Sequence, residues 1–600
     1  MAAVFGVAVA ATFPAATAVA TSYYVAPTGN DAAAGTMAAP WATVAHAQAL
    51  AAPGDTVYFR GGRYGFSAGT AACASETDTI NVVVLSKSGV EGRLIEYRGY
   101  PGEKPIFDFS GIKDSCRVRG FAVTGSWLHL AGFAVTGVPQ NNNLNHESWG
   151  VWVSGSNNVF ELLDLHHNMG PGLFIQDGGG NLVLNCDSHE NYDPMTANGA
   201  GQSADGFGCH VSTGGTGNVF RGCRSWWNSD DGWDFIHAAE VVTVENSWSW
   251  YNGFLPGTMT PAPAGNGNGF KAGGFDVPET KVPAIPPSHV VRNCLAFSNK
   301  ASGFYANHEP AADRFYNNTA YANHPDFDLL GMLPDGTVLN LGVLRNNLAY
   351  GGTLVADATG PMVDASHDSW DLTPAVTVSD VDFLSTSMAG MDGPRQADGS
   401  LPCVPFMRLA PGSALVDKGV DVGLPFRGAA PDIGAFELGP CAGGSGGAAG
   451  NGGGAGSTAG AGGGGAYAGG ADGQGQAGGP GSGGGVTATG GSPATGGWSD
   501  ARGGGGGEGG TGTGGDPPGG SGGTPTANGT GGDMQSGGSG GGVGGASGKG
   551  GASGAMTAKA GGCGCGVSGA PAMSSLLVWI VGATLWGLSG RRRRRTSRVR

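Results

Sequence analysis

The chain has 600 residues, 120 of them glycine, and a formal net charge of −15. Most of the glycine excess follows residue 440, so the part of the chain able to bury a large core lies before it. The acidic balance argues against nucleic-acid binding, because phosphate-binding surfaces are basic. An acidic protein can still bind an acidic polymer when metal ions bridge the two.

The first 20 residues are small and apolar and end in Ala18-Val19-Ala20. This ending is typical of the cleavage region of a secretory signal, although the basic start of such a signal is missing. A truncated signal therefore stands beside a plain flexible start as the alternative. We expect an exported protein. The ten cysteines are scattered through a chain with a large core, which does not need a dense disulfide framework.

Residues 21–130 contain a helix-like stretch at 41–50, a Pro-Gly-Asp turn at 53–55 and a strand-like run at 56–59. Further strand-like runs occupy 81–85 and 94–97. A short amphipathic helix followed by strands is suited to capping a stack of strands. We therefore predict that 21–130 form an N-terminal cap and the first coils of the fold described next.

A seven-residue segment rich in Asn and aromatic residues recurs from residue 131 onward, with closest spacings of 23 and 24 residues. The copies lie at 131–137, 162–168, 185–191, 222–228, 246–252, 293–299, 317–323 and 346–352. Short β-prone runs at this period, with glycine turns and no helical pattern, predict a parallel β-helix with one coil per repeat. The expected fold class is therefore all-β, with the solenoid core at 131–352.

Two positions of the repeat are expected to form rows, because coil stacking places equivalent residues about 4.8 Å apart. The seventh position predicts an amide ladder along the helix axis, in which each Asn bonds to the next. Its members are Asn168, Asn191, Asn228, Asn252, Asn299 and Asn323. The fifth position predicts a stack of mostly aromatic side chains, namely Val135, His166, His189, Trp226, Trp250, Phe297, Tyr321 and Tyr350. We interpret both rows as structural, with Asn side chains as sugar ligands as the alternative.

Three cysteines, Cys186, Cys223 and Cys294, share the second position of the repeat. Neighbouring coils bring the first two within range of a disulfide. A stack of unbonded thiols is the other interpretation.

The composition of the sequence changes at residue 353 and again at residue 439. Residues 353–438 are less repetitive and predict a loop-rich cap that closes the last coil and covers its open strand edge. Residues 439–562 are a Gly-rich segment that cannot bury a core, so we expect a disordered tether.

The tail at 563–600 combines Cys563-Gly-Cys565, an 18-residue apolar run at 573–590 and five arginines at 591–595. The apolar run is just long enough to form one transmembrane helix, and the arginines favour the cytoplasmic side. This tail resembles the C-terminal sorting signals of myxobacterial surface proteins. The resemblance implies processing and anchoring at the Cys motif, followed by display at the cell surface or release; a plain single-pass anchor is the alternative.

A second register follows the ladder, in which a glycine precedes an apolar residue at Gly172, Gly206, Gly232, Gly269 and Gly303. It puts two acids, Asp205 and Asp231, just before equivalent glycines of successive coils. It puts Asp234 and Lys271 at equivalent positions just after them. With Asp230, four carboxylates are expected to converge on one face, with Lys271 about 5 Å along the axis.

Four carboxylates this close repel one another strongly unless they are protonated or bind a cation. Oxygen ligands with no His or thiolate among them favour Ca²⁺ over zinc. The cluster therefore predicts a calcium site beside a basic residue, with a solvated acidic turn as the alternative.

The runs at 203–207, 218–224, 228–234, 265–271 and 289–297 resemble the pectate lyases of polysaccharide lyase family nine. The likeness covers about residues 23–437. It implies a right-handed parallel β-helix that cleaves polygalacturonate by β-elimination. It also implies that Lys271 is the catalytic base and that Ca²⁺ is held by Asp205, Asp230, Asp231, Asp234 and the backbone carbonyl of Trp233.

Four further residues are expected near this face, where they are candidate contacts to uronate groups or sugar rings, with plain surface positions as the alternative. They are Lys300, Arg224, Tyr305 and His308. We expect a monomer whose partner is an acidic polysaccharide. Two other functions remain open at this stage: a β-helix hydrolase of polygalacturonate using Asp205, Asp230 and Asp231 as acid and base, and a non-catalytic calcium-binding adhesin.

Overall fold

The computed structural model describes residues 20–67, 73, 78–141, 147–195, 199–275, 282–333, 335–353, 355–356 and 362–441. The predicted signal up to residue 19, the predicted tether from residue 442 and the predicted tail at 563–600 lie outside the described residues. Within the described part, no helix has the length and apolar character needed to cross a membrane.

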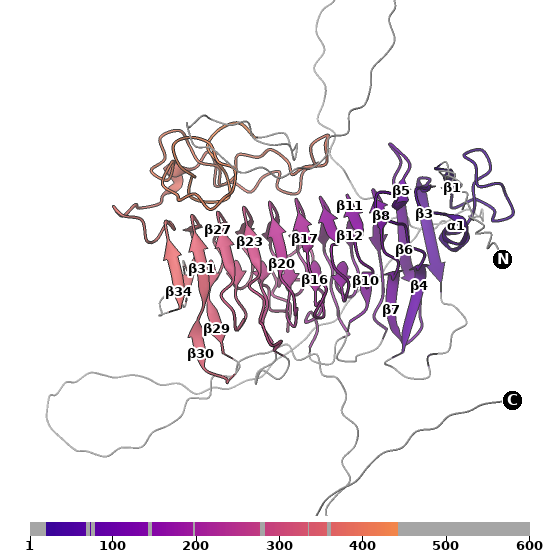
Figure 1. Cartoon of the computed structure of the whole chain (residues 1–600), viewed down its shortest axis with the longest axis horizontal. Coiled ribbons are helices and arrows are strands. Elements are labelled where there is room, and N and C mark those ends of the chain that lie inside the picture. Colours follow the sequence, from indigo (N-terminus) through magenta and orange to yellow (C-terminus); the bar gives the residue numbers. More distant parts are fainter. Residues whose placement is uncertain are drawn as a thin grey trace, which may run out of the picture. The chain divides into compact units, whose positions relative to one another are not determined.

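Short strands stack into three parallel sheets, and the chain passes through each sheet once per coil (Figure 1). Sheet 1 consists of β1 (Ser22–Val25), β2 (Thr56–Phe59), β5 (Ile95–Gly99), β8 (Leu128–Ala131), β11 (Val159–Glu161), β14 (Leu182–Leu184), β17 (Asn218–Arg221), β20 (Val242–Glu245), β23 (Val290–Arg292), β26 (Arg314–Tyr316), β31 (Gly342–Arg345) and β34 (Val363–Ser366). Sheet 2 consists of β3 (Gly62–Ser67), β6 (Pro105–Gly111), β9 (Ala134–Thr136), β12 (Asp164–His166), β15 (Asp187–His189), β18 (Arg224–Trp226), β21 (Trp248–Trp250), β24 (Leu295–Phe297), β27 (Thr319–Tyr321) and β32 (Leu348–Tyr350). Sheet 3 consists of β4 (Thr79–Leu85), β7 (Arg117–Val123), β10 (Trp149–Val153), β13 (Leu173–Ile175), β16 (Phe207–Cys209), β19 (Trp233–Asp234), β22 (Phe270–Lys271), β25 (Phe304–Tyr305), β28 (Phe327–Asp328) and β33 (Val355–Ala356). The predicted parallel β-helix is confirmed.

The remaining elements are few. Helix α1 (Val44–Leu50) begins at Thr43, whose hydroxyl accepts a hydrogen bond from the His46 amide at 3.1 Å. An antiparallel hairpin, β29 (Leu330–Met332) with β30 (Val338–Asn340), projects from one late coil, and a 3₁₀ turn, η1, spans Asp380–Asp382. The predicted helix and the strand at 56–59 are therefore present.

The interior is filled by rows of apolar side chains, one from each coil. In sheet 3 the row is aromatic, with neighbouring ring centroids 4.6 to 5.1 Å apart. Its members are Phe207, Trp233, Phe270, Phe304 and Phe327, all fully buried. A register shift of one residue would turn this row outward, so the row also fixes which residues of sheet 3 face out.

The predicted amide ladder is confirmed. Each of its six asparagines is buried and donates its side-chain amide to the next rung at 2.8 to 3.0 Å, ending on the carboxylate of Asp326. Shorter ladders that the repeat analysis did not predict run at another corner of the coils, with Asn181 donating to Asn218 and Asn347 donating to Asp368. The coil corners are therefore held by polar rows, and the interior by apolar ones.

The stack on the outward face of sheet 2 is also present. The ring centroids of His189, Trp226, Trp250 and Phe297 follow one another at 4.1 to 5.4 Å. The first member was predicted wrongly, because Thr136, and not Val135, pairs with His166. Segment 131–137 contains no Asn at any position to anchor the alignment, and it was therefore placed one residue out of register.

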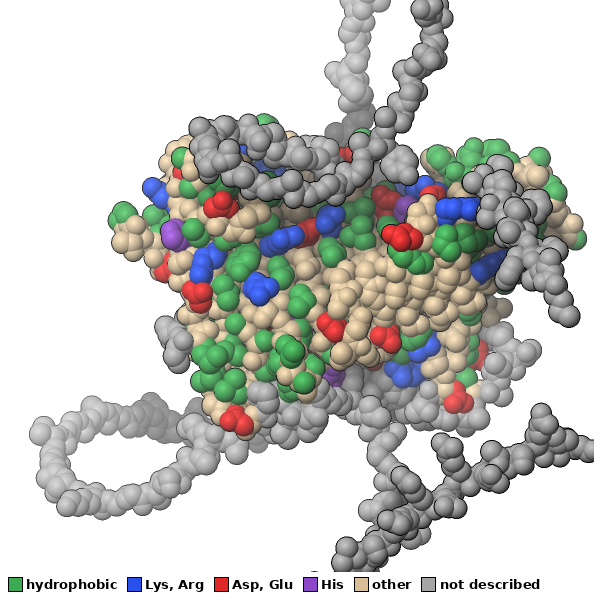
Figure 2. Space-filling model, viewed as in Figure 1, with side chains coloured by type: hydrophobic (Ala, Val, Ile, Leu, Met, Phe, Trp, Pro, Cys, Tyr) green, Lys and Arg blue, Asp and Glu red, His purple; other side chains and the backbone are tan. Residues whose placement is uncertain are grey.

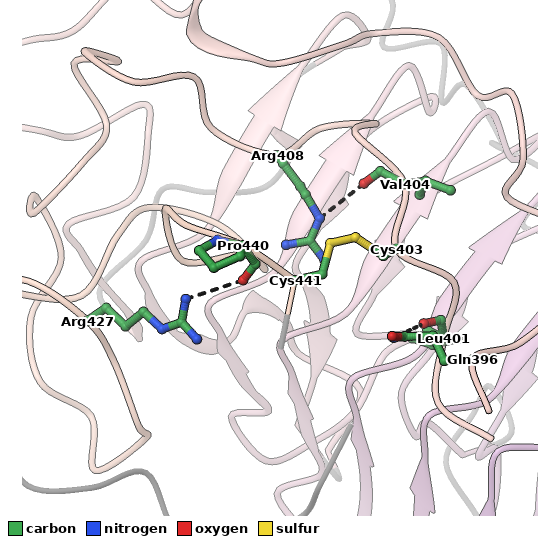
Figure 3. Close-up of a disulfide and its surroundings, with 8 residues drawn as sticks. All are labelled: Gln396, Leu401, Cys403, Val404, Arg408, Arg427, Pro440 and Cys441. Carbon is green, nitrogen blue, oxygen red and sulfur yellow. Dashed lines mark hydrogen bonds between the residues drawn. A yellow bond between two sulfur atoms is a disulfide. The ribbon is translucent and has the colours of Figure 1, made fainter. Parts of the chain in front are cut away.

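Cysteines 186, 223 and 294 are buried free thiols, so the unbonded stack is the correct interpretation. Among the described residues, disulfides join Cys73 to Cys116 and Cys403 to Cys441. The second of these holds the end of the described chain against residues 401–408, where Arg408 also donates to the Val404 carbonyl (Figure 3).

Residues 370–441, called here the C-terminal strap, contain little regular structure, as predicted. The strap runs back along sheet 2 (orange in Figure 1) instead of staying at the last coil, where Trp370 packs against Phe327. Arg395 of the strap reaches β15, where it pairs with Asp187 at 2.6 Å. The predicted placement at the last coil alone is wrong because the aromatic row of sheet 2 offers apolar surface that the strap buries.

The face drawn in Figure 2 carries acidic, basic and apolar side chains in small separate groups. The net negative charge is therefore not gathered into one patch on this face.

Candidate active site and metal centre

Tight glycine turns bring the acidic residues of neighbouring coils together. A Cβ atom at Gly206 or Gly232 would collide with the hydroxyl of a serine on the next strand of sheet 2 along the chain. The hydroxyls of Ser225 and Ser249 donate to the carbonyls of Gly232 and Gly269 at 3.1 and 3.0 Å. These two glycines directly precede strands of sheet 3. Because no side chain separates the coils there, the residues before each glycine lie directly beside one another.

The register places the residues after the glycines as predicted. Asp234 pairs with Lys271, and Lys271 with Tyr305, across neighbouring strands of sheet 3. Their strand neighbours Trp233 and Phe270 point into the core, so these three side chains lie on the outward face. The expected equivalence of Asp234 and Lys271 is confirmed.

Three carboxylates converge. Asp205, Asp231 and Asp234 each present an oxygen within 4.8 Å of the other two, and all three are buried. The Lys271 ammonium lies 3.0 Å from an Asp234 oxygen and 3.3 Å from Oδ2 of Asp231. Residues that are 66 positions apart in the sequence are thereby gathered around one point.

The acids perturb one another. Burial, followed by the charges of Asp234 and Asp231, raises the pKa of Asp205 well above its ordinary value. Burial also raises the pKa of Asp231, against the attraction of Lys271. For Asp234 burial acts in the same direction, but Lys271 and His210 outweigh it and the pKa is lowered. The protein alone therefore supplies too little positive charge for the whole cluster.

The donor set fits a hard cation. Asn268 holds Oδ1 of Asp231 through its backbone amide at 2.7 Å and its side-chain amide at 2.9 Å. The other oxygen, Oδ2, is buried and has no hydrogen-bond partner, although Lys271 is close enough to attract it electrostatically. A buried, oriented oxygen beside two further carboxylates, with no nitrogen or sulfur ligand in the group, is suited to Ca²⁺.

Asp230 is not part of the converging group. It is buried next to the site, and its carboxylate accepts a hydrogen bond from the Asn266 amide at 2.6 Å. The prediction that all four acids converge is therefore correct for three of them.

The four candidate substrate residues differ in their positions. Arg224 lies on β18 in sheet 2, where it pairs with Asp187 and donates to strap carbonyls, so its predicted place beside the acids is wrong. The ammonium of Lys300 is close to the acids but donates to the carbonyls of Ala262 and Gly265. It thus holds the 253–268 insertion in place.

Tyr305 and His308 do lie beside Lys271. Tyr305 is its neighbour in the next coil, and the two candidate rings have centroids 6.2 Å apart. Burial, and then the charge of Lys271, lowers the pKa of His308. Both remain on the face where the acids and the lysine gather.

Three residues of the site were missed from the sequence. Asn268 orients Asp231, as described above. His210 follows β16; burial lowers its pKa to about 4, and Nε2 has no hydrogen-bond partner. Glu147 is buried, and burial raises its pKa, with a further contribution from Asp234. The run Gly265-Asn-Gly-Asn-Gly269 contained a signal for the first. His210 lies five residues after Asp205 in the same coil but outside the recurring motif, and Glu147 comes from an earlier coil.

A cavity of about 560 Å³ lies on the other side of the coils, against sheet 2. Its lining includes Arg63, Lys113, His166 and His167 and none of the converging acids. It is separate from the carboxylate cluster, where the chemically distinctive groups are found.

Known proteins share this architecture. Residues 23–347 match the family model described as "Pel9A-like, right handed beta helix region". Pectate lyase L of Dickeya chrysanthemi is 35% identical over 420 residues, covering 69% of this chain and 90% of that protein. Pectate lyase PEL9 of Emericella nidulans is 31% identical over 427 residues, covering 68% and 96%.

Two solved structures are similar as well. Pectate lyase Pel9A aligns with a TM-score of 0.57 and 34% identity, covering 70% of this chain and 96% of that one. A structure titled "Rhamnogalacturonan lyase" aligns with a TM-score of 0.60 and 34% identity, covering 65% and 96%. The similarity includes the coils that carry the acids and Lys271.

Proposed function

This chain belongs to the Pel9A-like right-handed β-helix family and is a polysaccharide lyase, and we propose that it cleaves polygalacturonate by calcium-dependent β-elimination with Lys271 as the base. The observation that carries the proposal is the buried amine of Lys271 at 3.0 and 3.3 Å from two members of a three-carboxylate cluster. A hydrolase would need an acid and a base on opposite sides of a glycosidic bond, whereas these acids converge on one point. An adhesin would not need a buried lysine there.

In the proposed reaction Lys271 Nζ takes the proton from C5 of a uronate ring. The C5–H electrons form a C4–C5 double bond, the C4–O4 bond breaks, and the departing oxygen takes up a proton. Lys271 must be uncharged to accept the proton. Asp234 and Asp231, when ionised, favour the charged ammonium instead, so the base needs their charge to be balanced.

The residues that would hold a cation are Asp205, Asp231 and Asp234. Asp230 and the Trp233 carbonyl are further ligands by the family resemblance. When bound, Ca²⁺ supplies positive charge that balances these carboxylates and withdraws electrons from the uronate carboxylate. Asn268 keeps Asp231 in its orientation, and Tyr305 and His308 are proposed to contact the sugar next to Lys271.

Rhamnogalacturonan is a second candidate substrate. The specific observation in its favour is the 34% identity to a solved structure with that activity in its title. It also contains a uronate whose C5 proton is acidified by a carboxylate, so the same base and cation would act on it.

We also propose that the enzyme is exported as a monomer and is displayed at the cell surface or released. The signal-like start and the tail at 563–600 support this, and both lie in the part of the sequence outside the described residues.

The test is to incubate the purified protein with polygalacturonate and, separately, with rhamnogalacturonan, each with added calcium and with a chelator. Ultraviolet absorbance of an unsaturated product that disappears with chelator is the expected result on at least one polymer. Saturated reducing ends without that absorbance would mean a hydrolase. Binding of polymer without cleavage would mean an adhesin.

A further inference from the structure

The outward row of sheet 3 continues past the acids toward the N-terminal coils. The register runs from Lys271 through Asp234 to Gly208, then to Phe174 on β13 and Trp152 on β10. Two large aromatic residues therefore lie on the same face, and in the same row, as the proposed catalytic residues. Both are buried, 2% exposed for Phe174 and 9% for Trp152, in a small cluster with Trp149 that is separate from the interior core.

Gly208 lies in this row between Asp234 and Phe174. A Cβ atom at Gly208 would press on the ring of Phe174, so this ring extends over the glycine toward the acids. On that side the Phe174 ring contacts the ring of His210, with centroids 4.6 Å apart. The buried aromatic cluster thus reaches the carboxylate cluster without a polar side chain in the row between them.

At the far end of the row a cation lies on the aromatic surface. The Arg119 guanidinium of β7 is 3.5 Å from the ring centroid of Trp152 and 5.2 Å from that of Trp149. Its hydrogen bonding within the described residues is a single long contact of 3.4 Å to Asn81, and no ion pair joins it to a described carboxylate. Burial, and then the like charge of Arg117, lowers the pKa of Arg119 to about 10.

We propose that Arg119, held on Trp152, binds the carboxylate of a uronate residue in a distal subsite of the polysaccharide, on the face of sheet 3 that carries the proposed catalytic residues. The guanidinium fork matches a carboxylate in shape and charge, and an arginine stacked on a ring is already oriented for it. The occupant is a uronate unit because the guanidinium of Arg119 lies on the same face of the sheet as the site and has no carboxylate partner among the described residues. The inference rests on the proposed function.

Distance sets which substrates reach the subsite. Strand β7 is five coil intervals from β22, about 24 Å at the usual strand spacing. A trisaccharide centred on Lys271 ends short of Arg119, whereas a long polymer spans both. Arg119 therefore acts on affinity for long chains and not on the proton transfer.

The experiment compares Arg119→Gln and Arg119→Lys with the unaltered protein on polygalacturonate and on trigalacturonate. Loss of one charge-assisted bond is expected to raise KM for the polymer about tenfold in R119Q. The rise is expected to exceed that for the trisaccharide at least fivefold, while kcat for the polymer changes less than twofold. R119K keeps the charge but loses the fork, so an intermediate KM is expected. Arg314→Gln on sheet 1, an exposed arginine, is the matched control.

A binding measurement keeps the inference testable without turnover. In a Lys271→Ala background, titration calorimetry with a long oligogalacturonate is expected to show about tenfold weaker binding when Arg119→Gln is added. Circular dichroism checks that the variants are folded. Equal KM changes on polymer and trisaccharide, or no change in oligogalacturonate affinity, would overturn the subsite. If no cleavage of any polymer is found but the affinity loss persists, the proposed function fails while the subsite stands.

Discussion

The outward faces of sheets 2 and 3 are built by the same coil stacking, but sheet 2 is covered by the C-terminal strap and sheet 3 carries the candidate active site. On sheet 2 the row from His189 to Phe297 is aromatic, and the C-terminal strap lies over it. On sheet 3 the equivalent row carries Asp234, Lys271 and Tyr305. Both rows align residues from distant parts of the sequence in single file.

The difference lies in what the buried groups contribute. Aromatic side chains under the strap bury apolar area, which stabilises the fold. Buried carboxylates cost free energy unless they are paired, and two of the three, Asp205 and Asp231, have raised pKa values. A solenoid can therefore carry a destabilising row on one face because the ladders and the apolar rows on the others hold the coils together. Substitutions on the two faces should then separate activity from stability.

The largest expected effect comes from Lys271→Ala on sheet 3. Removing a general base is expected to lower kcat on the cleaved polymer by up to 10⁴-fold. The protein with calcium should stay folded, since the core row of Phe270 is untouched. Ultraviolet assays with the exposed Lys104→Ala as control measure this. Normal turnover in K271A would refute the base assignment.

The opposite pattern is expected for Trp250→Ala on sheet 2. Its ring is 3% exposed and stacked between Trp226 and Phe297, so the variant leaves a cavity under the strap. The free energy of unfolding is expected to fall by about 3–4 kcal/mol, measured by urea denaturation, with activity per folded molecule unchanged. The half-buried Trp227→Ala should cost clearly less. A loss of kcat in folded W250A would mean that the two faces are coupled.

The smallest effect is expected for Asp205→Asn without calcium, and here the substitution is expected to increase stability at higher pH instead of lowering it. The folded-state pKa of Asp205 is raised, so the folded form binds its proton more tightly than the unfolded chain does. Its contribution to stability is therefore present at low pH and is lost as pH rises from the unfolded value near 3.8 through the raised one. D205N should therefore lose less stability over that range than the unaltered protein.

With calcium bound, the unaltered protein should be more stable than D205N. At a hundredfold excess over its dissociation constant a cation stabilises the native state by about 2.7 kcal/mol. D205N should gain much less stability from calcium than the unaltered protein does. Urea titrations at acid and alkaline pH, with and without calcium, measure this gain. The exposed Asp335→Asn is the control and should behave as the unaltered protein. An unchanged calcium gain in D205N would exclude Asp205 as a ligand.

Much of the fold followed from the repeat. Asn at the end of six segments fixed their alignment, and seven of the eight segments have the predicted register, as in the pairing of Trp226 with Trp250. Segment 131–137, which contains no Asn, slipped by one residue, whereas 346–352, which begins with two, kept its register. The strap was misplaced because nothing local in its loops says which surface they cover.

The sequence by itself determined the parallel β-helix, the amide ladder and the convergence of Asp205, Asp231, Asp234 and Lys271. Each repeat forms one coil, so residues that align in the sequence are stacked about 4.8 Å apart in the structure. Only the tertiary structure decided that Asp230 stays outside the group, that Arg224 pairs with Asp187 on the other sheet, and that Arg119 rests on Trp152. Those outcomes depend on where long side chains and loops come to rest, and a backbone repeat does not set them.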